Sequence, residues 1–356
     1  MKRSYFLLII LALALAGCSQ QPDFESFPKI DAHAHLETSD VSFVEVLKEN
    51  NFLLMSLVTR SVSQPLIEEE FNYARELYEG HPESVAFATT FSMDGFGKPG
   101  WEERTIEWLK QSFDEGAIAV KVWKDIGMTF LDKDSSYIMM DDIRFDPIWD
   151  FIKSQDKTLI NHVGEPLNCW LALEEMTVRG DSNYFANHPE YHMYLHPAAP
   201  SHEALMASRD HVLEKHPGLR FVGCHLGSLE YDVDEQAKRF DNYPNFSVDM
   251  AARISHFKVQ DRDKVRAFII KYQDRLLYGT DIGIRSGGAT GSTKARMEDI
   301  VENTYLSDWE YFTTDQMLEQ NDKVKTYQGL DLPVKVLRKI YSENAKKMYP
   351  GIGQSL

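Results

Sequence analysis

The amino-acid sequence predicts a single α/β domain, a closed (β/α)8 barrel of TIM type in which eight parallel strands each lead into a helix. Short apolar runs alternate with segments of helical period along the 356 residues, and no shift in composition marks a second domain. The length also suits such a barrel, which typically has about 250 residues and tolerates insertions. An open doubly wound sheet is the alternative, but no glycine-rich phosphate loop follows the first apolar run.

The elements follow from the spacing of apolar residues. The predicted strands end at or near His35, Val58, Phe91, Trp123, His162, His225, Asp249 and Asp281. The clearest helical periods cover residues 65–78, 101–113, 144–155 and 202–215, and several of them stop at Gly, Pro or Asn. A long insertion rich in aromatic residues, 166–201, follows strand five, and an extended C-terminal helical segment covers 334–348. We expect the insertion to wall the pocket or to form a small core of its own.

The N-terminus is typical of a secretory signal. Lys2 and Arg3 precede an apolar run over 5–16, which is too short for a transmembrane span and ends in Leu15-Ala16-Gly17-Cys18. This ending resembles the bacterial lipobox, whose cysteine becomes the lipidated first residue of the mature protein. We therefore expect an exported, membrane-anchored lipoprotein at the periplasmic face or the outer membrane. The predicted parts are a lipoprotein signal peptide (1–17), a lipidated linker starting at Cys18 (18–27) and the barrel (28–350).

Charge and cysteine content restrict the partners. The net charge is −17 and becomes −19 without Lys2 and Arg3, and no basic stripe is present, so a nucleic-acid partner is excluded. Beyond Cys18 only Cys169 and Cys224 remain, and one pair makes no disulfide framework. An exported protein could pair them, but Cys224 lies in a strand pattern typical of a small buried hydrophobic residue.

Histidines and an aspartate close four of the predicted strands. His33 and His35 point to the same side of strand one, because side chains alternate along a strand. His162, His225 and Asp281 end later strands, and catalytic residues of such barrels lie at the C-terminal strand ends. This set predicts a divalent metal site. Imidazole and carboxylate ligands suit zinc, and manganese, iron or cobalt less distinctively.

Several short motifs resemble those of the amidohydrolase superfamily. The motifs are Asp31-Ala32-His33-Ala34-His35, Asn161-His162-Val163-Gly164, Gly223-Cys224-His225-Leu226-Gly227-Ser228 and Tyr278-Gly279-Thr280-Asp281. The sequence is most similar to the amidohydrolase-related branch, which holds aminocarboxymuconate semialdehyde decarboxylase-like enzymes and several lactonases. The resemblance implies metal-dependent chemistry on small organic substrates. It also implies that His33, His35, His162 and Asp281 are metal ligands and that His225 is a catalytic acid or base, or an extra ligand.

Lys121 is expected to point into the barrel. Val120 and Val122 share one face of strand four, and Ala119 and Lys121 share the other. A buried lysine needs a carboxylate, a role at a metal or a depressed pKa. We favour one metal ion, with Lys121 as a catalytic residue that contacts substrate or acts electrostatically. Two alternatives stay open. A carboxylated Lys121 could bridge two ions, or an unmodified Lys121 could form an ion pair with Asp281.

Two further residues are candidate substrate ligands. Arg253 follows strand seven, and an arginine at a barrel mouth can hold a substrate carboxylate through two hydrogen bonds. Its alternative role is a surface ion pair. Glu165 lies three residues after His162 and could contact substrate, or it could be a first-turn glutamate of a helix.

These features predict a metal-dependent hydrolase of a small-molecule substrate, with activated water as the nucleophile. Asp281 would take the proton of the water, and His225 with Lys121 would polarise the carbonyl group. A lactone is the first choice of substrate, followed by an ester or amide of a carboxylic or sugar acid. Non-oxidative decarboxylation on the same metal site is the second hypothesis, and a non-catalytic ligand-binding lipoprotein is the third. A homodimer is an open option.

Overall fold

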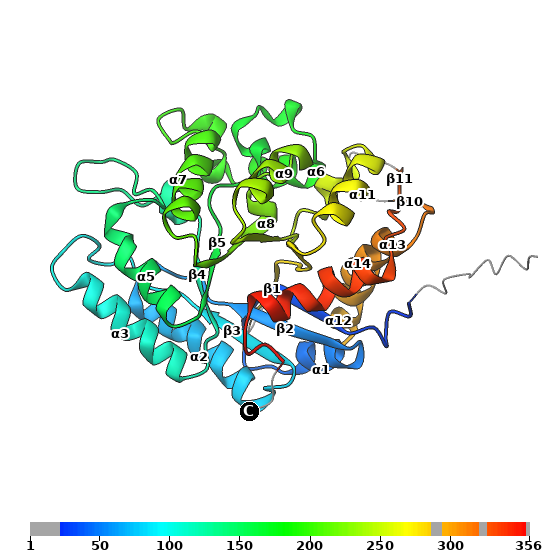
Figure 1. The fold of residues 1–356 in the computed structure, drawn as a ribbon, viewed down its shortest axis with the longest axis horizontal. Helices are drawn as coiled ribbons and strands as arrows, with labels where there is room; N and C mark the ends of the chain where they lie inside the picture. The colour runs from blue at the N-terminus through cyan, green and yellow to red at the C-terminus, as the bar shows by residue number, and fades with distance from the viewer. Residues whose placement is uncertain (1–21, 286–293, 320–325, 354–356) are drawn as a thin grey trace, which may run out of the picture.

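A computed structural model describes residues 22–285, 294–319 and 326–353 and confirms the predicted (β/α)8 barrel (Figure 1). Nine strands form one parallel sheet in the order β8-β7-β6-β5-β4-β3-β2-β1-β9. The strands are β1 (Lys29–Glu37), β2 (Phe52–Leu57), β3 (Val85–Thr89), β4 (Ala119–Val122), β5 (Thr158–Asn161), β6 (Arg220–Gly223), β7 (Phe246–Asp249), β8 (Leu276–Leu277) and β9 (Ile282–Arg285). The first seven lie where the apolar runs predict them.

The eighth strand is interrupted, whereas the sequence predicts one strand that ends at Asp281. β8 pairs with β7, β9 pairs with β1, and the four residues between them leave the regular ladder. Two backbone hydrogen bonds keep this segment on β1, from Ala32 N to the Tyr278 carbonyl at 3.0 Å and from Asp281 N to the His33 carbonyl at 2.8 Å. β8 and β9 are therefore two halves of one strand, and they close the barrel.

Helices surround the barrel, with α2, α3 and α5 along one flank and the C-terminal helices along another (Figure 1). The helices are α1 (Ser42–Glu49), α2 (Gln64–Gly80), α3 (Trp101–Asp114), α4 (Asp125–Met128), α5 (Asp146–Ser154), α6 (Arg179–Asn187), α7 (His202–Lys215), α8 (Cys224–Gly227), α9 (Val233–Asn242), α10 (Ile254–Lys258), α11 (Arg262–Lys271), α12 (Lys294–Ile300), α13 (Ser307–Thr313), α14 (Val334–Arg338) and α15 (Asn344–Met348). A π-helical turn, η7 (Lys339–Glu343), joins α14 to α15, so the predicted segment 334–348 is helical throughout.

The chain forms two apolar layers. The larger lies between strands and helices and includes Val120 and Val122. The smaller fills the barrel, where Ala119 and Cys224 meet Met348 and Tyr349. The end of α15 therefore closes one end of the barrel, and the functional side chains occupy the other.

The insertion after strand five consists of α6 and short 3-10 turns, η2 (Leu167–Trp170), η3 (Leu173–Glu175), η4 (Pro189–Tyr191) and η5 (Met193–Leu195). Cys169 and Cys224 are both free and buried, so the optional disulfide is absent between them. Cys18 lies outside the described residues, and the lipid anchor stays a prediction. Within the described ranges, no helix is both long and apolar enough to cross a membrane.

Candidate active site

His33 and His35 face the centre of the barrel mouth from β1, as the alternation of side chains predicts. Their ring centroids lie 5.2 Å apart. His33 is fully buried, whereas the side chain of His35 is 17% exposed and lines a pocket. Strand one therefore places one imidazole beneath the pocket floor and the other at its surface.

Three imidazoles of the site are fixed through Nδ1 by a group that accepts hydrogen bonds. The contacts join His33 Nδ1 to Asp249 Oδ2 at 2.9 Å, His35 Nδ1 to the Leu57 carbonyl at 2.8 Å and His225 Nδ1 to the Ala251 carbonyl at 3.0 Å. Since carbonyl and carboxylate oxygens only accept, each Nδ1 carries a hydrogen and each Nε2 lies on the side of its ring away from that partner. Metal-binding histidines are oriented by such outer partners.

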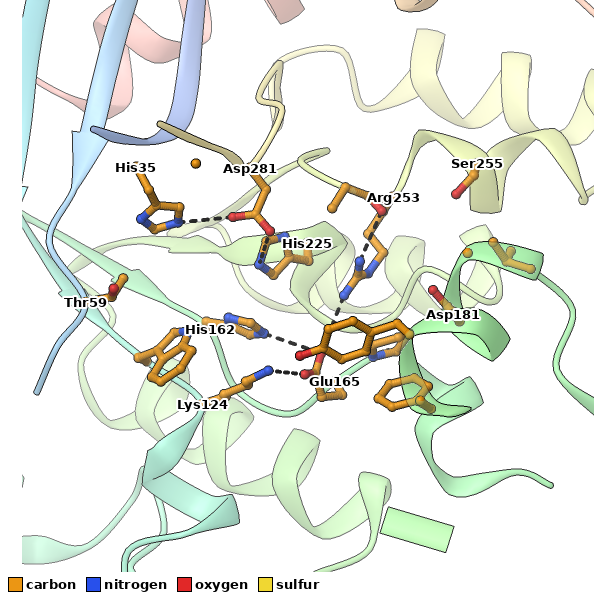
Figure 2. A pocket seen from close by; sticks show the side chains of 18 of the residues that line it. His35, Thr59, Lys124, His162, Glu165, Asp181, His225, Arg253, Ser255 and Asp281 are labelled. Carbon is orange, nitrogen blue, oxygen red and sulfur yellow. Dashed lines mark hydrogen bonds and ion pairs between the residues drawn. The ribbon is translucent and has the colours of Figure 1, made fainter. Parts of the chain in front are cut away.

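The three Nε2 atoms meet at one carboxylate, that of Asp281, and Figure 2 shows His35 and His225 beside it. His33 Nε2 and His35 Nε2 lie 3.2 and 3.1 Å from Asp281 Oδ1, and His225 Nε2 lies 3.8 Å from Oδ2. Burial alone would raise the pKa of Asp281, but the neighbouring His225 and His33 hold it well below its ordinary value. Asp281 is therefore ionised, and its negative charge lies among these Nε2 atoms at the floor of the pocket.

The residues present fit a divalent metal ion. The ligand atoms of His33, His35 and Asp281 all lie within 4.8 Å of one another. Burial and Lys121 act to lower the pKa of His33, but Asp249 and the other acidic neighbours raise it well above its usual value. The floor thus attracts positive charge, which a proton on His33 or a metal ion can supply.

His162 ends β5, as predicted, and lies beside His225 with a ring separation of 4.3 Å. Its Nε2 is buried and has no hydrogen-bond partner in the described part of the chain. Burial, and then His225, Lys121 and Lys124, lower the pKa of His162 well below its ordinary value, so the ring is neutral. The nearest printed contact of this Nε2 is Glu165 Oε2, at 3.9 Å. A neutral buried imidazole whose Nε2 makes no hydrogen bond is a suitable metal ligand, and this role stays a prediction.

The turn after β6 adopts an unusual backbone that aims His225 into the site. His225, Leu226 and Ser228 have φ angles of 59°, 58° and 55°, and Gly227 has a φ of 58°. Left-handed conformations of non-glycine residues are unfavourable and persist only where surrounding contacts impose them. Here Arg209 Nη1 donates to the Gly227 carbonyl, and the Ser228 hydroxyl donates to the Val163 carbonyl at 2.7 Å. The fold therefore fixes the strained turn.

Asp249 is a functional residue that the sequence analysis does not assign. At the end of β7 it accepts hydrogen bonds from His33 Nδ1, from His225 N at 2.9 Å and from Ala251 N at 3.2 Å. Although burial acts to raise the pKa of Asp249, His33, His225 and Lys121 hold it far below its ordinary value. Its place at a strand end was the only indication in the sequence. The carboxylate therefore fixes the ring of His33 and the backbone of His225.

Lys121 points into the barrel, as predicted, and is fully buried. Its Nζ donates to Cys224 Sγ at 2.7 Å, which is a partner that the sequence does not suggest. Lys121 is also one of the residues that line the pocket. The positive charge therefore lies under the floor, and a contact with substrate stays a prediction.

Glu165 and Arg253 come together at the far side of the pocket with Lys124 (Figure 2). Glu165 forms a buried ion pair with Lys124 through Oε1, and its Oε2 lies 3.7 Å from Arg253 Nη2. Arg253 is 9% exposed and lines the pocket, so it is not a surface ion pair. Its Nε has no hydrogen-bond partner among the described residues. The guanidinium thus has donors available for a ligand.

The pocket between these groups measures about 480 Å³, which suits a small molecule. One end holds His35, His162, His225 and Asp281, and the other holds Lys124, Glu165 and Arg253. Trp123 and the insertion residues Tyr184 and Phe185 complete the wall. Asp181 of α6 lies 3.3 Å from His256 of α10, so the insertion is attached to the barrel. It walls the pocket, as expected.

A sequence model of the amidohydrolase family matches residues 30–351, which is most of the chain. The chain belongs to the amidohydrolase family. Amidohydrolases usually bind a divalent metal, and the cluster of His33, His35 and Asp281 could hold one here. No curated protein sequence matches the chain.

Solved structures support the amidohydrolase fold. The chain is similar to a 2,6-dihydroxybenzoate decarboxylase in complex with 2,6-dihydroxybenzoate, with a TM-score of 0.51, 14% identity and coverage of 91% of this chain and 99% of that one. It is also similar to a dihydroorotase from Campylobacter jejuni, with a TM-score of 0.50, 11% identity and coverage of 93% and 85%. At this identity the likeness establishes the barrel alone.

Proposed function

We propose that this amidohydrolase is a metal-dependent hydrolase of a small organic substrate, with a lactone as the first choice and an ester or amide of a carboxylic or sugar acid next. The observation that carries the proposal is the convergence of three Nδ1-fixed imidazoles on the Asp281 carboxylate at the floor of a pocket. Such an arrangement orients the ring nitrogens for a metal ion before it binds.

His33, His35, His162 and Asp281 would hold one divalent ion, with zinc as the first choice. When bound, the ion would lower the pKa of a water molecule and supply Lewis acidity. The second hypothesis, decarboxylation, uses the same ligands and needs no attacking water. The two chemistries therefore differ in their products and not in their metal site.

The protein groups around the ion have distinct roles in the proposed reaction. Asp281, whose side chain is 33% exposed, is ionised and would accept the proton of the attacking water. His225 Nε2, 3.8 Å away, would receive this proton and pass it to the leaving oxygen or nitrogen. Because His225 Nδ1 donates to Ala251 and burial lowers the pKa of the ring, its Nε2 is an acceptor at neutral pH. This geometry favours proton transfer over the carbonyl polarisation that the sequence analysis expects.

Arg253 supports a substrate that carries a carboxylate. Arg253 lines the pocket beside Glu165, and its Nε has no hydrogen-bond partner in the described part of the chain. A guanidinium binds a carboxylate through two parallel hydrogen bonds. The rings of Trp123 and Tyr184 would contact the body of such a substrate.

A substrate panel tests the proposal. The metal-loaded protein is assayed with lactones, esters, amides and unsaturated carboxylic acids, each with and without a free carboxylate, while acid release and CO2 release are both measured. We expect ring opening of a carboxylated lactone, and its loss in Asp281→Ala. Release of CO2 without hydrolysis would assign the site to decarboxylation. No turnover of any class would favour a ligand-binding protein.

A further inference from the structure

A second group of metal-type ligands lies directly beneath the proposed metal site. The ligand atoms of His33, Cys224 and Asp249 all lie within 4.8 Å of one another, and all three residues are buried. His33 belongs to both groups, because its Nε2 faces Asp281 and its Nδ1 faces Asp249. We call His33, Cys224 and Asp249 the inner trio. Cysteine, histidine and aspartate are common zinc ligands, so this trio is chemically able to bind an ion of its own.

A lysine already supplies positive charge at the inner trio. Lys121 Nζ approaches Cys224 Sγ to 2.7 Å, and neither residue is exposed. Lys121 also acts electrostatically on Asp249 and His33. From the opposite end of the barrel, the buried Tyr349 ring interacts electrostatically with Asp249 and Cys224. Lys121 is therefore the basic side chain that the structure places against the inner trio.

A buried negative charge needs a positive charge nearby, and the Asp249 carboxylate of the inner trio is such a charge. Either a metal ion or an ammonium group can supply it, and the two would compete for the same space. We propose that the ammonium group of Lys121 is a built-in cation of the inner trio, so that the protein binds one divalent ion above His33 and excludes a second ion below it. This inference rests on the proposed metal site, and it adds the reason why a second ion is excluded.

The same contacts disfavour a carboxylated Lys121. A carbamate on Nζ would replace a positive charge with a negative one close to Asp249. It would also need room on the side of Nζ where Cys224 Sγ lies 2.7 Å away. Metal loading should therefore not depend on bicarbonate.

Cobalt titration tests the inference. Chelator-treated full-length protein is titrated with Co2+, and bound metal is counted while the near-ultraviolet spectrum is followed for the charge-transfer band of a thiolate ligand. We expect one equivalent for the wild type, no thiolate band and no change with bicarbonate. Lys121→Ala should bind two equivalents and show the band. Lys121→Ala with Cys224→Ser should return to one equivalent, and Cys224→Ser alone should keep one.

Several outcomes would overturn the inference. A wild type that binds two equivalents, that shows the thiolate band or that needs bicarbonate would do so even if Lys121→Ala does not fold. A folded Lys121→Ala that binds only one equivalent would also contradict it. A wild type that binds one equivalent supports the proposed metal site whatever Lys121→Ala does. A wild type that binds none overturns the proposed function, and the inference with it.

Discussion

Asp249→Asn should weaken metal binding without changing the fold. The asparagine keeps Oδ1, which accepts from His225 N and Ala251 N. It replaces Oδ2 with an NH2 group, which cannot accept the hydrogen of His33 Nδ1, 2.9 Å away in the wild type. His33 must then either lose this hydrogen bond or move the hydrogen to Nε2, the atom that would bind metal.

The structure sets the size of this effect. The lost contact is one charge-assisted hydrogen bond, worth about 1.5–3 kcal/mol, which corresponds to a metal Kd raised roughly 10- to 150-fold. Competition with a chromophoric chelator measures the Kd. Asp308→Asn is the matched control, because Asp308 is partly buried but accepts from the Tyr278 hydroxyl at 3.1 Å instead of a histidine of the site. If Asp249→Asn binds metal as tightly as Asp308→Asn, the proposed orientation of His33 is wrong.

Three other predictions concern the pocket, the pH dependence and the N-terminus. Arg253→Ala should raise KM for a carboxylated substrate about 10- to 100-fold, because one charge-assisted contact is lost, and should leave KM for its methyl ester unchanged; an equal loss for both would refute a carboxylate contact. His202 donates from Nε2 to the Ser228 carbonyl, and burial lowers its pKa to about 4, below the 6.5 of the unfolded chain. Between these two pH values the unfolded state therefore binds one proton more than the folded state. The wild type should lose up to about 3 kcal/mol of its unfolding free energy relative to His202→Gln as the pH falls from 6.5 to 4. Urea unfolding measures this difference, and an equal pH dependence of the two proteins would contradict the assignment. Cys18→Ala should move the protein from the membrane fraction to the soluble fraction, and unchanged fractionation would argue against lipidation.

The sequence predicts the fold well because the apolar pattern records which face of each element is buried. The helix 202–215 has the predicted bounds, and the first seven strands lie close to the predicted positions. The apolar pattern does not predict the break between β8 and β9. It depends on a left-handed Asp281, with a φ of 67°, and on hydrogen bonds to β1 that exist only once the barrel is closed.

The sequence predicts the site residues that end strands. It does not predict which of them contact each other, because those contacts depend on how distant strands are aligned in the barrel. His33, His35, His225 and Asp281 converge as their positions suggest. The partners of these residues come from distant strands: Asp249 lies 216 residues from His33, and Cys224 lies 103 residues from Lys121. No local pattern marks an aspartate as the acceptor for a particular ring. The tautomer of His225, and with it the direction of proton transfer, likewise depends on one carbonyl of a later strand end.

The central claim is that His33, His35 and Asp281 hold a metal ion, with His162 as the predicted fourth ligand. Anomalous diffraction at the zinc edge, from crystals of the zinc-loaded protein, tests it most directly. We predict one peak, about 2.0–2.2 Å from Nε2 of His33 and His35 and from an oxygen of Asp281. A crystal with zinc bound elsewhere and no peak between these residues would contradict it.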